Sequence, residues 1–141
     1  MKKTAVVYWS GTGNTQMMAE AVLEGMKQGG ADAMLLTSAE ASSIDLSAFD
    51  AIAFGCPAMG AEVLEESEFE PMFTACKDKL AGKTVALFGS YGWGDGEWMR
   101  EWEKDCEASG IRLACESVIC CEAPDTAAQD ACKALGEELT K

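Results

Sequence analysis

Short apolar runs alternate with amphipathic segments along the whole chain. Five runs rich in apolar and β-branched residues predict strands at residues 3–9, 33–37, 50–55, 83–89 and 111–121. The last run is interrupted near Ser117, where we expect a kink or an extension. Four longer segments place apolar residues on one face and predict helices at residues 14–28, 67–80, 97–108 and 127–139.

This alternation predicts an α/β fold in which helices cover both faces of a parallel sheet. Right-handed crossovers leave few topologies, and five strands fit a three-layer, doubly wound sheet in the order 2-1-3-4-5. The chain has no linker, internal repeat or low-complexity tract, so we expect residues 1–141 to form a single domain. Ligands of such sheets bind beyond the carboxyl ends of the strands. The loops after the first, third and fourth strands are therefore the candidate site.

The charge of the chain is strongly unbalanced. Asp and Glu number 24 against 11 Lys and Arg, which gives a formal net charge of −13, and histidine is absent. The acidic balance disfavours nucleic acid and anionic membranes as partners, because both attract basic patches. Without imidazole, Ser-His-Asp, Cys-His and His-metal chemistry is excluded.

The cysteines and the N-terminus favour a cytoplasmic protein. The first apolar run is too short for a signal peptide, and no run approaches the ~20 apolar residues of a membrane span. Seven cysteines without a Cys-x-x-Cys pair argue against a disulfide framework or a zinc ribbon. Cys115 and Cys120 have the first spacing of a plant-type ferredoxin, but Ala123 occupies the third ligand position. We therefore expect no metal and mostly buried thiols.

The loop after the first strand reads Ser10-Gly11-Thr12-Gly13-Asn14-Thr15 and precedes a helix. Glycines let backbone N–H groups point inward, and a helix N-terminus carries partial positive charge, so this segment is built as a phosphate cradle. The alternative is an ordinary turn in which one Ser or Asn caps the helix.

The kind of phosphate follows from what the cradle lacks. A P-loop ends in Gly-Lys-Ser or Gly-Lys-Thr, but no Lys or Arg occurs between Lys3 and Lys27. The dinucleotide fingerprint requires Gly or Ala where this chain has Gln16. A single terminal phosphate held by neutral donors is what remains.

The other two loops contain flat or polarisable side chains next to glycines. Met59-Gly60 follows the third strand, and Trp93 stands between two glycines after the fourth. Trp93 is suited to stack on a planar ring, although either side chain could instead turn into the core. The carboxylates at 62, 65, 66, 68 and 70 are expected to form a solvated face, and Trp98 and Trp102 are expected in the core.

Together the three loops resemble those of a flavodoxin of the short-chain branch. The segments that carry the resemblance are Ser10-Gly-Thr-Gly-Asn-Thr15, Pro57-Ala-Met-Gly60 and Gly89-Ser-Tyr-Gly-Trp-Gly94, in matching order and spacing over nearly the whole chain. The resemblance implies a low-potential one-electron carrier with non-covalently bound FMN, shuttling between redox proteins. It implies FMN-binding residues at Trp9, Ser10, Gly11, Thr12, Gly13, Asn14, Thr15, Pro57, Ala58, Met59, Gly60, Glu62, Ser90, Tyr91, Gly92, Trp93 and Gly94.

Individual roles also come from the resemblance. The cradle would hold the FMN phosphate, and Trp9 would lie beside the ring or the ribityl chain. Met59 would pack on the inner face of the flavin and Trp93 on the outer face. Gly60 would be the peptide that flips when the flavin gains an electron. Glu62 would accept a hydrogen bond from the flavin N3–H, and backbone N–H groups of residues 90–92 would meet the pyrimidine edge.

Two positions depart from the family pattern. Pro57 stands where some relatives have serine, so we expect one donor fewer at the phosphate. Ala61 stands where others often have Asp, Asn or Ser, and we expect it to change the conformer preference of the Gly60 turn.

The acidic charge bears on how such a carrier would work and on which partners it would meet. Nearby carboxylates would oppose a reduced, anionic flavin and would steer a monomeric carrier toward basic patches on redox partners. An FMN-dependent NAD(P)H:quinone-type oxidoreductase is the alternative, but the site loops contain no Lys, Arg or His. A phospho-receiver domain would need acidic residues where Trp9-Ser10 stands and a lysine after the last strand, and neither is present.

Overall fold

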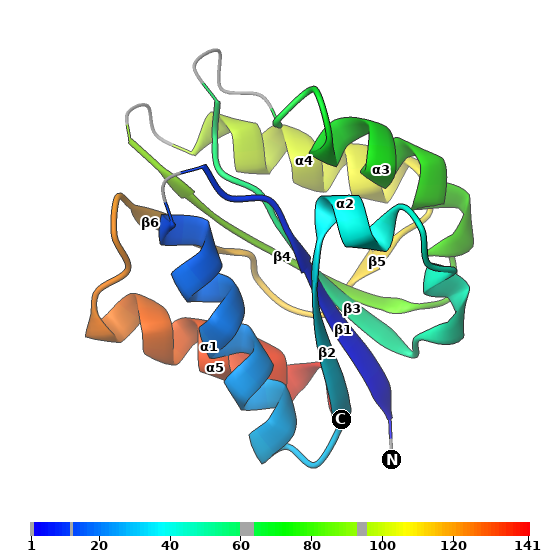
Figure 1. Cartoon of the computed structure of the whole chain (residues 1–141), viewed down its shortest axis with the longest axis horizontal. Helices are drawn as coiled ribbons and strands as arrows, with labels where there is room; N and C mark the ends of the chain where they lie inside the picture. Colours follow the sequence, from blue (N-terminus) through cyan, green and yellow to red (C-terminus); the bar gives the residue numbers. More distant parts are fainter. Residues whose placement is uncertain (1, 12, 60–63, 93–95) are drawn as a thin grey trace.

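The core of the fold is a parallel sheet whose strand order is β2-β1-β3-β4-β5, with β6 also paired to β4 (Figure 1). The computed structural model describes residues 2–11, 13–59, 64–92 and 96–141. The strands are β1 Lys3–Tyr8, β2 Asp32–Thr37, β3 Ala51–Gly55, β4 Thr84–Tyr91, β5 Arg112–Leu113 and β6 Val118–Cys121. The predicted order 2-1-3-4-5 is confirmed, and the fifth position is shared by two short strands.

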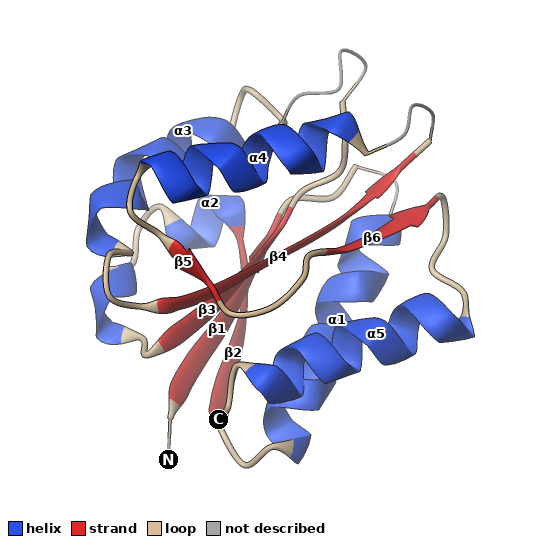
Figure 2. Ribbon diagram, turned by 180° about the vertical axis from the view of Figure 1, so that it is seen from behind, coloured by secondary structure: helices blue, strands red, loops and turns tan. Residues whose placement is uncertain are grey.

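Helices cover both faces of this sheet, as predicted. The α-helices are α1 Asn14–Gln28, α2 Ser38–Ala41, α3 Phe69–Cys76, α4 Glu97–Ala108 and α5 Thr126–Glu138, and the 3₁₀ turns are η1 Leu46–Ala48 and η2 Lys77–Lys79. Figure 2 shows α1 and α5 on one side of the sheet and α2, α3 and α4 on the other. No helix in these described ranges is long and apolar enough to cross a membrane.

On the face toward α1 and α5, the central strands contribute several small side chains. Ala51, Ala53 and Ala86 point to this side and are fully buried. The two helices also pack closely on each other, because a β-carbon at Gly25 would come within 2.0 Å of the Lys133 carbonyl oxygen. At the crossing, only glycine permits this approach of the two backbones.

The opposite face contains the larger side chains. Phe54 lies edge-on to Phe73 with ring centroids 5.0 Å apart, and Trp102 lies edge-on to Phe69 at 5.4 Å. Trp98 and Trp102 are 1% and 2% exposed, which confirms their expected place in the core. The two faces thus alternate along each strand, as pleated strands require.

Three elements of the structure differ from the predicted ones. The fourth strand continues to Tyr91, because β6 pairs with residues 88–91. The polar stretch after β2 contains α2, which begins with a capping box between Thr37 and Glu40. The predicted helix 67–80 is α-helical only over Phe69–Cys76 and ends in the turn η2.

One of the carboxylates expected on a solvated face is buried, so that expectation was wrong for Glu65. The side chain is 5% exposed, and its carboxylate accepts hydrogen bonds from the N–H groups of Ser67 at 3.0 Å, Glu68 at 2.7 Å and Phe69 at 2.9 Å. The Ser67 hydroxyl donates to it as well. Glu65 therefore accepts hydrogen bonds from the free N–H groups at the start of α3, which belong to residues two to four positions further along the chain.

These contacts control the charge of Glu65. Burial alone would raise its pKa, but the hydrogen bonds from the Ser67 hydroxyl and from the three backbone N–H groups outweigh burial. Together they lower the pKa from 4.5 to about 2.

The cysteines are all free thiols, as the odd number suggested. Cys56, Cys76, Cys106 and Cys132 are buried, and burial raises the pKa of each of these thiols to between about 11 and about 12. Cys115 and Cys120 are half-buried and Cys121 is exposed, so the expectation of buried thiols is met at four positions only.

We predict that Glu65→Gln lowers the free energy of unfolding at pH 7 by about 3 kcal/mol. The carboxyl has a lower pKa in the folded than in the unfolded chain, so its contribution is complete above about pH 5. The contribution is then lost as the pH falls from 4.5 through about 2. Urea unfolding of both proteins should therefore show a difference that shrinks to roughly half at pH 3.

The matched control is Glu66→Gln, which removes the same charge from an exposed neighbour. Its effect should stay within about 0.5 kcal/mol. An equal difference between wild type and Glu65→Gln at pH 7 and pH 3 would contradict the assignment of the cap to the ionised carboxylate.

Candidate functional site

Backbone hydrogen bonds continue past the ends of the strands and hold several loops side by side at the carboxyl edge of the sheet. Each bond joins the backbone N–H of a residue beyond a strand end to a carbonyl oxygen of the neighbouring strand. They run from Trp9 N–H to Gly55 O at 3.0 Å, Cys56 N–H to Phe88 O at 3.2 Å, Ala58 N–H to Ser90 O at 3.0 Å, and Glu122 N–H to Tyr91 O at 2.7 Å. The loops after β1, β3, β4 and β6 therefore meet at one place.

A hollow of about 520 Å³ opens between these loops. Its lining contains predicted site residues from three separate loops, namely Asn14, Pro57, Ala58, Ser90, Tyr91 and Gly92. Glu122 and Ala123 from the loop after β6 complete the lining. The volume is within the usual range for pockets that bind small molecules.

Helix α1 begins next to this hollow, and among the described residues no side chain caps it. Gly13, at the cap position, has φ of 95°, a left-handed conformation that favours glycine, and its N–H donates to Ser10 Oγ at 3.0 Å. Gly13 has no side chain to accept the first N–H groups of this helix, unlike the Ser or Asn of an ordinary capped turn. Those N–H groups and the positive end of the helix dipole are suited to an anion.

The cradle is joined to β4 by a buried pair of hydroxyls. Thr15 Oγ1 and Ser90 Oγ are 2.8 Å apart, and the two residues are 1% and 4% exposed. The structure thus brings together two predicted site residues that are 75 positions apart in the sequence. Their side chains hydrogen-bond to each other, so this pair locks the start of α1 onto the sheet.

The other described site residues lie around this junction. Trp9 and Met59 are half-buried, and Trp9 packs against the core on the α3 and α4 side of the sheet. A β-carbon at Gly11 would come within 3.1 Å of the Trp9 indole, so this ring lies directly against the cradle. Predicted site residues Thr12, Gly60, Glu62, Trp93 and Gly94 lie outside the described residues.

The formal charge in the described lining of the hollow comes from one side chain. Among the described residues that line it, Glu122 carries the only formal charge, and no Lys or Arg is present. Glu122 has φ of 61°, in the left-handed region that non-glycine residues rarely adopt. Glu122 and Ala123 were not among the predicted site residues, because the prediction covered only the loops after the first, third and fourth strands. The turn Glu122-Ala-Pro-Asp125 after the last apolar run was the available signal.

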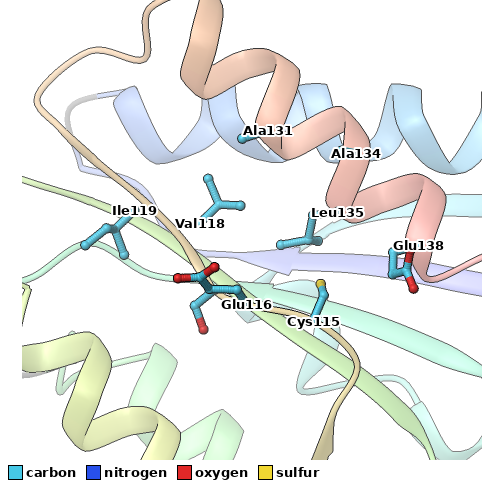
Figure 3. A pocket seen from close by; sticks show the side chains of 9 residues that line it. Cys115, Glu116, Val118, Ile119, Ala131, Ala134, Leu135 and Glu138 are labelled. Carbon is cyan, nitrogen blue, oxygen red and sulfur yellow. The ribbon is translucent and has the colours of Figure 1, made fainter.

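A second hollow of equal size, about 520 Å³, tests whether size alone could identify the site. Figure 3 shows it between the segment 115–119 and α5, with apolar side chains such as Val118 and Leu135 and two carboxylates, Glu116 and Glu138. These carboxylates would repel an anionic ligand, and the N-terminus of α5 is already capped by Asp125. Chemistry therefore favours the hollow beside α1 for a phosphorylated ligand.

Known proteins resemble the chain over almost its whole length. The family model for flavodoxin matches residues 6–136. A flavodoxin of Megasphaera elsdenii is 46% identical over 96% of this chain and 97% of its own, and one of Clostridium beijerinckii is 45% identical over 95% and 96%. The solution structure of two-electron reduced Megasphaera elsdenii flavodoxin superposes with a TM-score of 0.88 at 45% identity, covering 97% of this chain and 98% of that one.

We predict that the Thr15–Ser90 hydroxyl pair is energetically coupled. Ser90→Ala or Thr15→Val leaves one buried hydroxyl without its partner, so each should lower the free energy of unfolding by about 1–3 kcal/mol. The double variant should lose less than the sum of the two, with a coupling energy of about 0.5–3 kcal/mol from a urea-unfolding cycle on the ligand-free chain. Simple additivity would show that the two hydroxyls do not interact.

Proposed function

The chain belongs to the flavodoxin family, and we propose how this FMN-binding electron carrier holds its cofactor and uses its charge. The observation that carries the proposal is the uncapped N-terminus of α1, which opens beside a hollow whose described lining contains no Lys or Arg. Such a site suits a ligand with one terminal phosphate and an uncharged planar body. Bound FMN supplies the one-electron redox chemistry, and the residues of this chain bind, orient and tune it.

The phosphate is assigned to the cradle 10–15. Backbone N–H groups at the start of α1 and the hydroxyl and amide groups of Ser10, Thr12 and Asn14 are its neutral donors. The Ser10 hydroxyl accepts a hydrogen bond from the Gly13 N–H. This hydroxyl can exchange that loop contact for one to the phosphate. Thr15 contributes through its backbone, since its side chain is buried against Ser90.

The ring is assigned to the hollow between the loops. Pro57 and Ala58 line it together with the segment Ser90–Gly92. The family resemblance adds Met59 and Trp9 to this assignment. Gly60, Glu62, Trp93 and Gly94 are part of the same proposal through the family resemblance, Gly60 as the redox-sensitive peptide, Glu62 as a ring acceptor and Trp93 as the outer wall. Pro57 contributes no N–H, so the cradle must supply the backbone donors that the phosphate needs.

Charge sets the direction in which the protein tunes its cofactor. A carboxylate about 10 Å from the ring opposes an added electron by about 1.7 kcal/mol at an effective dielectric constant of 20, before screening by salt. Several such groups lower the reduction potential, which accords with a low-potential carrier. We assign the acidic surface as the docking face for basic patches of redox partners, and we assign to the chain a monomeric, cytoplasmic, non-enzymatic role.

The test of the function is a spectroscopic redox titration of the purified protein. The protein should be yellow as isolated and should take up two electrons in two separate one-electron steps. Mixing it with NADPH alone should cause no rapid oxidation of the nucleotide. Rapid NADPH oxidation would identify an FMN-dependent oxidoreductase instead, and protein that neither contains nor binds FMN would refute both functions.

We further predict that Glu122 lowers the reduction potential of bound FMN. Glu122→Gln removes the only formal charge among the described residues of the hollow while keeping the size of the side chain. The potential of the second electron should rise by some tens of millivolts, more at low than at high salt.

The control for this prediction is Glu116→Gln, which makes the same charge change in the second hollow, next to α5. It should shift the potential much less. Equal shifts in the two variants would show that net charge alone, and not the position of Glu122, sets the potential.

A further inference from the structure

A hydrogen bond between Cys56, directly after β3, and Glu65 makes a closure next to the site residues Pro57 and Ala58. The Glu65 N–H donates to Cys56 Sγ at 3.4 Å, which joins two residues nine positions apart. Both residues are buried, at 0% and 5% exposure. The bond is made by residues on either side of the site segment Pro57–Met59, and neither residue lines the hollow.

Cys56 is itself held in place from three directions. Its N–H donates to Phe88 O at 3.2 Å, and its carbonyl accepts the indole N–H of Trp98 at 3.1 Å. Its thiol also lies 3.5 Å from Pro57 O, within reach of donating a hydrogen bond. Burial raises the pKa of this thiol to about 12, so the sulfur stays protonated and can donate to one carbonyl while accepting one N–H.

Glu65 connects this closure to a helix. Its carboxylate caps α3 through the Ser67, Glu68 and Phe69 N–H groups, so its backbone position is set by the helix end. The chain is thereby fixed to β4 at Cys56 and to α3 at Glu65. Pro57 and Ala58 follow directly after the fixed Cys56, so they lose less conformational freedom when a ligand binds.

We propose that Cys56 and Glu65 are positioning residues for the cofactor, which hold Pro57 and Ala58 at the hollow without touching the ligand. This inference rests on the proposed placement of FMN in that hollow. It assigns a role in cofactor affinity to a buried thiol and to a carboxylate that belongs to a helix cap. Their contribution comes from preorganising the binding segment, as distinct from any direct contact.

The first test is the affinity of the holoprotein for FMN, measured from the fluorescence of FMN released on dilution. Glu65→Gln should raise the Kd about tenfold, because the amide cannot accept all the N–H groups of the cap. Glu66→Gln, which removes the same charge from an exposed neighbour, should leave the Kd within twofold of wild type. Hydrogen exchange of the Ala58 amide, which donates to Ser90 O, should accelerate in Glu65→Gln but not in Glu66→Gln.

The second test changes the other half of the closure and leaves the helix cap intact. Cys56→Ala removes the acceptor of the Glu65 N–H and should raise the Kd severalfold. Cys56→Ser keeps a hydroxyl that can accept this bond and should restore the Kd to within twofold of wild type. This pair decides the question even if Glu65→Gln does not fold.

The outcomes separate this inference from the proposed function. If Cys56→Ala and Glu65→Gln unfold more easily but release FMN like wild type, the closure is purely structural and the inference is wrong. The same holds if Cys56→Ser weakens binding as much as Cys56→Ala. If the wild-type protein holds no FMN, the proposed function itself fails.

Discussion

The site depends on backbone pairing that does not stop where the strands end. At the carboxyl edge of the sheet, four backbone N–H groups donate hydrogen bonds to a neighbouring strand. They belong to Trp9, Cys56, Ala58 and Glu122. A loop tied in this way cannot move far from the next one without breaking these backbone hydrogen bonds. The hollow therefore keeps its shape through the sheet, and α1 and β4 are joined to the same edge by the Thr15–Ser90 pair. The closure between Cys56 and Glu65 extends this principle to residues behind the site.

Different parts of the molecule attract an anionic group and set the electrostatic field that acts on the reduction potential. An anionic group is attracted by the uncapped start of α1, whose backbone supplies partial positive charge without any basic side chain. The rest of the molecule carries a net charge of −13, and Glu122 places one carboxylate in the lining of the hollow itself. In the proposed arrangement, oriented dipoles would hold the phosphate locally, while an electron added to the ring would meet a negative field. A Lys or Arg in the cradle would strengthen phosphate binding but would work against a low potential.

Local sequence patterns predicted elements well wherever local interactions decide them. Helix α4 begins and ends as expected, because Gly96 precedes it and Trp98, Met99 and Trp102 share its buried face. The strand pattern also located the break near Ser117, which separates β5 from β6. Prediction failed where a distant segment decides the outcome. The fourth strand extends to Tyr91 because β6 lies beside it. Glu65 is a local exception, since its carboxylate is held by the N–H groups of residues two to four positions away.

The sequence by itself determined the order of strands and helices, the glycine- and hydroxyl-rich cradle, the acidic balance and the family to which the chain belongs. These features are written in neighbouring residues or in composition, so no contact between distant segments is needed to recognise them. Tertiary structure alone decided that the Thr15 and Ser90 hydroxyls pair, that Glu122 enters the lining of the hollow and that Cys56 meets Glu65. The physical reason is that strand register and helix packing set these distances, and both depend on residues that are far apart along the chain.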